Sequence, residues 1–152
     1  MSQINQEIEE GLNQIAKDDE LSGHIYILKS KSEDEVIRNI QNLYKIGYAS
    51  QSVKQRIKNA KNEATYLMAD VEYITSYKVY NIDAKKLEKL LHQFFGNSCL
   101  NIKIVADDGE YHTPREWFIA PFEVIKQAIF MILNEEIIHY KYNEAKQYIE
   151  SK

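Results

Sequence analysis

The stretch from Gly23 to Leu28, Gly-His-Ile-Tyr-Ile-Leu, is a short run of aliphatic, β-branched and aromatic residues. A run of this kind is typical of a buried β-strand. A similar run, Leu-Tyr-Lys-Ile-Gly-Tyr-Ala at residues 43–49, follows a polar insertion that has room for one helical turn. The two runs predict an antiparallel pair of strands joined by an elaborated loop.

Beyond these two runs, the sequence alternates between helical and strand patterns. A helix is predicted after the second strand because apolar residues recur three or four positions apart, at Val53, Ile57, Ala60 and Ala64. Residues 70–80 alternate in polarity and predict a third strand. Asp83 is a favourable N-cap for a helix that stops at Gly96. Its expected core positions are Leu87, Leu90, Leu91, Phe94 and Phe95.

The C-terminal part of the chain adds short strands and helices. Residues 100–105 and 116–120 predict a hairpin around the turn Ala-Asp-Asp-Gly-Glu. Pro121 is well placed to start a helix, and residues 135–149 have the spacing of a last amphipathic helix. The predicted fold class is α+β: a small, mainly antiparallel three-stranded sheet flanked by helices, with an extra terminal hairpin and helical N- and C-terminal extensions.

The 152 residues are enough for one domain with short appendages. Residues 1–22 are predicted to be an acidic leader or linker, with an amphipathic helix over residues 3–17. Residues 23–120 form the predicted main domain. Residues 121–152 are expected to be a helical extension packed on it.

The net charge of −4 is distributed unevenly along the chain. Residues 1–22 hold one basic against six acidic side chains, a net charge of −5. The rest of the chain holds 18 basic and 17 acidic side chains, and residues 44–62 hold five basic and no acidic ones. A basic segment of this kind is either a solvated helix face or a contact for nucleic acid.

Composition disfavours secreted and membrane-spanning classes of protein. Cys99 is the single cysteine, so the chain holds neither an internal disulfide framework nor a cysteine-based zinc site. No apolar run approaches the roughly 18 residues of a membrane span, and the N-terminus lacks a basic-then-apolar leader. We therefore expect a protein of the cytoplasm.

Five short motifs follow one another on the predicted strands and helices. They are Gly23-His24-Ile25-Tyr26, Tyr44-Lys45-Ile46-Gly47, Arg56, Leu87-Glu88 with His92, and Glu116-Trp117-Phe118. In this order and on these elements, they resemble the GIY-YIG nuclease superfamily, and most closely its phage-derived branch with a Glu-Trp-Phe motif. The resemblance covers residues 23–120.

The resemblance implies a metal-dependent endonuclease that hydrolyses phosphodiester bonds in DNA, with RNA left open as a second substrate. Glu88 is the expected ligand of Mg²⁺ or Mn²⁺, since Mg²⁺ often takes only one or two protein carboxylates. Arg56 presents a permanently charged donor fork that suits the phosphate in the transition state. Tyr26 and Tyr44 are expected to line the site. One of them, with Tyr44 favoured, is expected to accept the proton of the attacking water with help from nearby cations.

Two further side chains are expected beside the metal, each with more than one role open. His92 lies one turn after Glu88 on the same side of the helix. There it orients the carboxylate, shuttles a proton, contacts the metal, or is a half-buried structural residue. Glu116 is either a second acid near the metal or a partner of Arg56 or Arg115.

The remaining predicted residues contact the substrate or shape the backbone. The expected substrate contacts are Lys45, Lys54, Lys58 and Tyr48. Two glycines, Gly23 and Gly47, are expected to allow close backbone approach beside the site.

A second class of function also fits these patterns: a catalytically weak nucleic-acid-binding or interaction module of a larger assembly. A helical oligomerisation protein built on residues 1–20 and 121–150 would leave the motifs between them unexplained. Because one site with one metal cuts one strand, cleavage of both strands would need a homodimer, two encounters or a partner. Membership in a parent multidomain protein is equally open.

Overall fold

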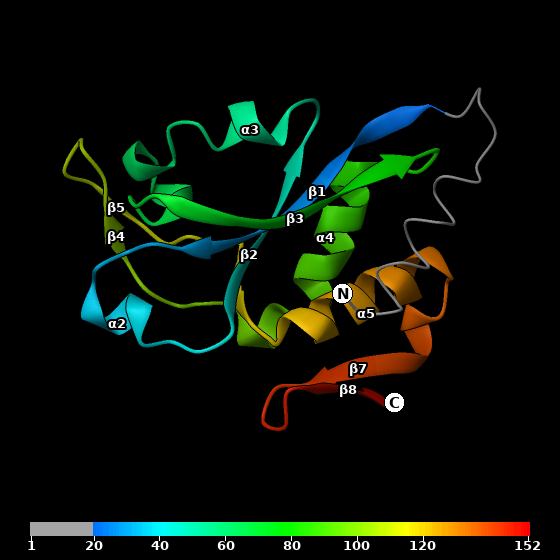
Figure 1. Cartoon of the computed structure of the whole chain (residues 1–152). Coiled ribbons are helices and arrows are strands. Elements are labelled where there is room, and N and C mark those ends of the chain that lie inside the picture. Colours follow the sequence, from blue (N-terminus) through cyan, green and yellow to red (C-terminus); the bar gives the residue numbers. More distant parts are fainter. Residues whose placement is uncertain (1–19) are drawn as a thin grey trace.

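The computed structural model describes residues 20–152, and its centre is a four-stranded antiparallel sheet in the order β3-β1-β2-β6 (Figure 1). The strands are β1 (Leu21–Ser30), β2 (Leu43–Ala49), β3 (Val71–Tyr80) and β6 (Trp117–Ile119). The α+β class is confirmed, but the main sheet has four strands rather than three. The predicted helix over residues 3–17 lies outside the described residues.

The central strand β1 is buried on both faces, which explains its unbroken apolar run. Its register places Tyr26 opposite Gly47 and Ile27 opposite Ile46. Because side chains alternate along a strand, Ile27 and Tyr26 enter different cores. The loop between β1 and β2 contains the predicted helical turn, α2 (Glu35–Arg38).

One face of the sheet is covered by α4 (Ala84–Phe94) and α5 (Phe122–Leu133), as Figure 1 shows. Asp83 caps α4 as predicted, with its carboxylate accepting from the backbone N–H groups of Lys85 and Lys86. The predicted core face of α4 is present except at Leu90, which is exposed. The core on this side includes Ile25, Ile27, Ile46, Leu87, Leu91, Phe95 and Phe118.

The opposite face of the sheet is covered by short helical turns. They are α3 (Val53–Arg56), η1 (Ala60–Asn62) and η2 (Ala64–Tyr66). The prediction of one helix over residues 53–64 is therefore wrong beyond its first turn. Two asparagines, at positions 59 and 62, favour turns over helix, and burial of Tyr66 draws the chain back to the sheet.

The predicted hairpin between residues 100–105 and 116–120 is replaced by two separate pairings. Strand β4 (Ile104–Val105) pairs with β5 (Tyr111–His112), while β6 joins the edge of the main sheet beside β2. Contact between the two predicted partners persists at Leu100, whose N–H donates to the carbonyl of Trp117 at 2.8 Å. Trp117 is fully buried, so its burial favours the sheet over a local hairpin.

Helix α5 begins directly after Pro121 as predicted, but the predicted last helix over residues 135–149 is wrong. That segment forms η4 (Ile137–His139) and a hairpin of β7 (Tyr140–Asn143) and β8 (Tyr148–Ser151). Tyr142 packs edge-on against Phe95, with ring centroids 5.0 Å apart. This tertiary contact, together with tyrosine's preference for strands, overrides the helical spacing.

Candidate active site

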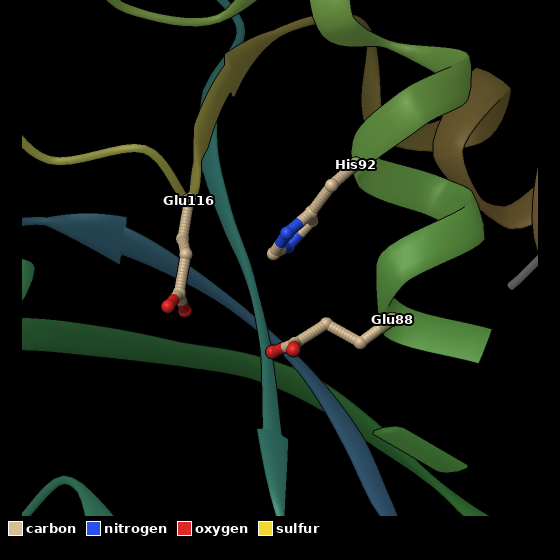
Figure 2. A group of neighbouring side chains, drawn as sticks. All are labelled: Glu88, His92 and Glu116. Carbon is tan, nitrogen blue, oxygen red and sulfur yellow. The ribbon is translucent and has the colours of Figure 1, made fainter. Parts of the chain in front are cut away.

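Three potential metal ligands meet where β6 begins at the edge of the sheet (Figure 2). Glu88 and His92 lie one turn apart on α4, and Glu116 directly precedes β6. One ligand atom from each residue lies within 4.8 Å of the others, and all three side chains are partly buried. The structure thus brings together the three residues that the sequence places near a metal.

The backbone of Ile46 on β2 holds two of these residues in place. Its N–H donates to the carbonyl of Glu116 at 3.0 Å, and its carbonyl lies 2.7 Å from Nε2 of His92. Since a carbonyl only accepts, Nε2 carries the proton and Nδ1 of the neutral ring holds the lone pair. Burial lowers the pKa of His92, which favours this neutral ring.

Glu88 is the carboxylate most affected by its surroundings. Burial, and secondarily the negative charge of Glu116, raise the pKa of Glu88 to about 7. Two acids held this close repel each other when both are ionised. A divalent cation between them would remove that repulsion, so the donor set fits a metal ion.

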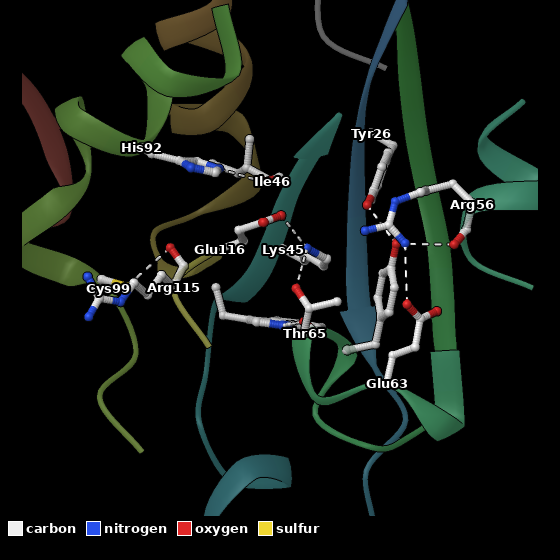
Figure 3. Close-up of polar contacts among 12 residues, drawn as sticks. Tyr26, Lys45, Ile46, Arg56, Glu63, Thr65, His92, Cys99, Arg115 and Glu116 are labelled. Carbon is white, nitrogen blue, oxygen red and sulfur yellow. Dashed lines mark hydrogen bonds and ion pairs between the residues drawn. The ribbon is translucent and has the colours of Figure 1, made fainter. Parts of the chain in front are cut away.

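Lys45 lies at the centre of the site and is 0% exposed. Its Nζ donates to Oε1 of Glu116 and lies 3.4 Å from Oγ1 of Thr65 (Figure 3). Burial lowers the pKa of Lys45, and the neighbouring carboxylate of Glu116 opposes this effect. The side chain of Lys45 therefore points toward Glu116 and not into the solvent. A direct contact with substrate, as predicted from the sequence, would require an exposed ammonium group. Glu116 accordingly pairs with Lys45 and not with Arg115.

Tyr26 reaches the site from the neighbouring strand, above Gly47. A Cβ atom at position 47 would overlap the ring of Tyr26, so only glycine fits there. The hydroxyl groups of Tyr26 and Tyr66 lie 2.8 Å apart, and both residues are fully buried. Burial raises the pKa of the Tyr26 phenol far above its usual value, with the hydrogen bond to Tyr66 as the next cause.

Tyr66 has a role that sequence reasoning missed. Its ring centre lies 4.9 Å from Nζ of Lys45 and 5.2 Å from the guanidinium carbon of Arg56, so it contacts both cations. Its hydroxyl also lies 3.3 Å from the carbonyl of Arg56. The only sequence signal was a large aromatic in a polar segment, and nothing there identifies its neighbours.

Arg56 ends α3 with its side chain 40% exposed, and Nη1 lies 3.6 Å from Glu63. Lys54 and Lys58, the predicted substrate contacts beside it, are exposed as well. These three cations, which we call the α3 basic surface, lie on the same side of the sheet as Tyr26 and Tyr66. All three are exposed, so an anionic partner could reach them, although Arg56 already pairs with Glu63.

Tyr44 and Tyr48 lie on the other face of β2. The ring of Tyr44 packs against Phe122 of α5, with centroids 5.8 Å apart, and Tyr44 is 8% exposed. Tyr48 lies over Gly23, where an added Cβ would come within 2.8 Å of the Tyr48 ring. The structure thus separates Tyr44 from Tyr26 and does not bring the two predicted tyrosines together.

Within residues 20–152, every helix is too short or too polar to cross a membrane.

Comparison with known proteins gives one family and one relative. The model of the T5orf172 domain matches residues 23–133. The uncharacterized protein YeeC of Bacillus subtilis (strain 168) is 42% identical over 125 residues, which are 80% of this chain and 33% of YeeC. The chain thus spans about one third of the length of this relative. No solved structure matches the chain.

Proposed function

The chain belongs to the T5orf172 domain family, a phage-associated family in the context of endonucleases, and on this premise we propose that it is a metal-dependent endonuclease domain of the GIY-YIG type. It would hydrolyse phosphodiester bonds in DNA. The observation that carries the proposal is the convergence of Glu88, His92 and Glu116 within 4.8 Å.

The metal side of the site would be formed around Glu88. This carboxylate would hold Mg²⁺ or Mn²⁺, with Glu116 close by. When bound, the ion would supply Lewis-acid stabilisation of charge on the phosphate.

The α3 basic surface would bind the substrate backbone. Arg56 can present two N–H groups to the phosphate, and its charge is permanent at any working pH. Lys54 and Lys58 would add contacts to flanking phosphates, which makes binding weaken as salt rises. Tyr66 supports this surface, since its ring contacts the guanidinium of Arg56.

The proposal assigns the proton of the attacking water to neither predicted tyrosine. Tyr44 packs against α5, on the face of the sheet opposite Tyr26 and the α3 basic surface. Tyr26 is kept as a neutral phenol, because burial raises its pKa. Tyr26 would instead act as a positioning residue that fixes Tyr66 through the 2.8 Å hydroxyl contact.

A plasmid-nicking assay with Mg²⁺, Mn²⁺ or EDTA tests the proposal. We expect Glu88→Gln and Arg56→Ala to lower the nicking rate about 100-fold or more, as for other groups that stabilise transition-state charge. Exposed residues of the same types, in Glu35→Gln and Arg38→Ala, provide matched controls and should leave the rate unchanged. Equal nicking by the wild type and Glu88→Gln would contradict the assignment of the site.

A nucleic-acid-binding module with little catalysis is the second candidate. Two observations favour it: Lys45 is fully buried, and Arg56 already has Glu63 as a partner. Fluorescence anisotropy with labelled DNA and RNA, run beside the nicking assay, separates the two. Binding that depends on Lys54 and Lys58 without cleavage in either metal would favour the module. Because the chain spans about one third of YeeC, a larger parent protein or a homodimer belongs to the same proposal.

A further inference from the structure

The chemistry of the ligand cluster points to a particular class of metal. We propose that Glu88, His92 and Glu116 together form a three-ligand site that selects a first-row transition dication over Mg²⁺. This inference deepens the proposed function and rests on it, because it names the resident ion of the same site and adds two direct ligands to Glu88.

The spacing of the three ligand atoms is close to what such an ion requires. Nitrogen and oxygen ligands bind at about 2.0–2.2 Å, so two ligands of one ion lie at most about 4.4 Å apart. The three ligand atoms lie within 4.8 Å of one another, so small changes in side-chain position would bring all three into the coordination sphere of one ion. Three protein ligands leave the remaining positions open for water and for phosphate oxygen.

His92 is oriented as a metal-bound imidazole usually is. A ligating histidine normally donates its other ring N–H to a carbonyl or carboxylate, which fixes the tautomer and the ring. Here the carbonyl of Ile46 accepts from Nε2 at 2.7 Å. The ring also packs on Phe118, with centroids 5.0 Å apart. These contacts fix the orientation of the ring and leave the lone pair of Nδ1 available to a metal ion.

Glu116 has a free oxygen for the ion. Oε1 accepts from Lys45, so Oε2 is available as a ligand. The buried ammonium of Lys45 both fixes the carboxylate and offsets part of its charge. The two carboxylates and one ammonium leave an excess of one negative charge, which suits a dication.

The nitrogen ligand is what distinguishes transition metals from Mg²⁺. Mg²⁺ prefers an all-oxygen octahedral shell and gives up water reluctantly, whereas imidazole suits Mn²⁺ and the later first-row ions. Affinity at such a mixed site is expected to rise from Mn²⁺ to Co²⁺. The site should therefore bind Mn²⁺ at least about tenfold more tightly than Mg²⁺.

The test measures metal binding to the full chain without nucleic acid. Titration calorimetry with Mn²⁺ and Mg²⁺ compares the wild type with His92→Ala, and His112→Ala provides a matched control because His112 is exposed on β5. We expect His92→Ala to lower Mn²⁺ affinity about tenfold or more, to change Mg²⁺ affinity by less than about threefold, and His112→Ala to change neither. Unchanged Mn²⁺ affinity in His92→Ala, or equal affinity of the wild type for both ions, would overturn the inference.

A second measurement needs no variant, which matters if His92→Ala folds poorly. Electron spin-echo spectroscopy of the wild type loaded with Mn²⁺ should show ¹⁴N modulation from the imidazole. Its absence would overturn the inference. Failure of this inference can be distinguished from failure of the proposed nuclease function. Cleavage at limiting Mn²⁺ that His92→Ala leaves intact would keep the nuclease but reject this site, and ¹⁴N modulation without cleavage of DNA or RNA would do the reverse.

Discussion

Tyr44 and Lys45 are neighbours on β2, but they serve opposite faces of the sheet. Tyr44 packs against Phe122 under α5, whereas Lys45 reaches Glu116 and lies over the ring of Tyr66. The face with Tyr44 is an apolar core, and the face with Lys45 holds buried polar groups next to exposed cations. Position along the strand, more than residue type, therefore decides which side chain reaches the site.

The largest expected effect comes from crowding the face of Lys45. Gly47→Ala places a methyl carbon 2.2 Å from Cζ of Tyr26, which is far inside van der Waals contact, so the sheet or the ring must shift. We expect a loss of about 3 kcal/mol in the free energy of unfolding, measured by urea denaturation. Gly96→Ala is the matched control, because a Cβ there meets nothing within 4 Å. A loss below about 1 kcal/mol for Gly47→Ala would show that Tyr26 does not need this space.

The next largest effect is expected from breaking the ion pair between Lys45 and Glu116 on this face. Glu116→Ala leaves the ammonium of Lys45 buried without its carboxylate, which should cost about 2–3 kcal/mol of unfolding free energy. The double variant Lys45→Met with Glu116→Ala removes both charges and should recover most of that loss. Additive losses in the double variant would mean that the pair is not coupled.

The pH dependence of stability is expected to report on Glu88. Its folded-state pKa is raised to about 7, above its unfolded value of 4.5, so its contribution is present at low pH and is lost as pH rises through 7. We expect the metal-free protein to lose about 1 kcal/mol from this residue between pH 5 and 8, after allowance for solvent screening.

The Glu88→Gln variant controls this measurement. The lowered pKa of His92 makes its contribution to stability increase as pH rises, opposite to that of Glu88. His92 is present in both proteins, so its contribution cancels in the comparison. The difference between wild type and Glu88→Gln in thermal denaturation at each pH therefore isolates Glu88. A difference that does not change with pH would contradict the raised pKa. Saturating Mn²⁺ should stabilise the wild type more at pH 8 than at pH 5, because the metal competes with a proton.

The smallest effect compares two tyrosines across the sheet. Tyr66→Phe removes the hydroxyl that contacts Tyr26 and leaves that buried phenol without this partner. We expect a loss of about 1 kcal/mol in unfolding free energy. We also expect a several-fold slower nicking rate, because the carbonyl of Arg56 loses the Tyr66 hydroxyl that donates to it at 3.3 Å. Tyr44→Phe should leave the nicking rate unchanged. A slower rate in Tyr44→Phe with normal rate in Tyr66→Phe would reverse the comparison of the two faces.

Much of this arrangement is local enough to be predicted from sequence. The strands β1 to β3 and helix α4 have strong patterns, and Asp83 caps α4 as expected. The pairing of Glu88 with His92 follows from one turn of helix. In each of these cases, neighbours in the chain determine the geometry.

The errors arise where contacts distant in sequence decide. Tyr142 on Phe95 turns a helical spacing into a hairpin, and burial of Trp117 takes β6 out of the predicted hairpin. The position of Tyr44 on the face opposite Tyr26 could have been predicted. Three positions separate it from Gly47, so the strand period of two puts them on opposite faces. The contact of Tyr66 with Tyr26 could not be predicted from the sequence, because only folding brings these two residues together.

The peptide of Ile46 joins β6 and α4 through its N–H and its carbonyl, and this has a consequence during synthesis of the chain. Glu116 reaches Glu88 and His92 only when β6 has emerged from the ribosome and docked in register. A slip of one residue would present Arg115 or Trp117 instead. The cluster of Glu88, His92 and Glu116 is therefore incomplete in the nascent chain until β6, the last strand of the main sheet, is in place.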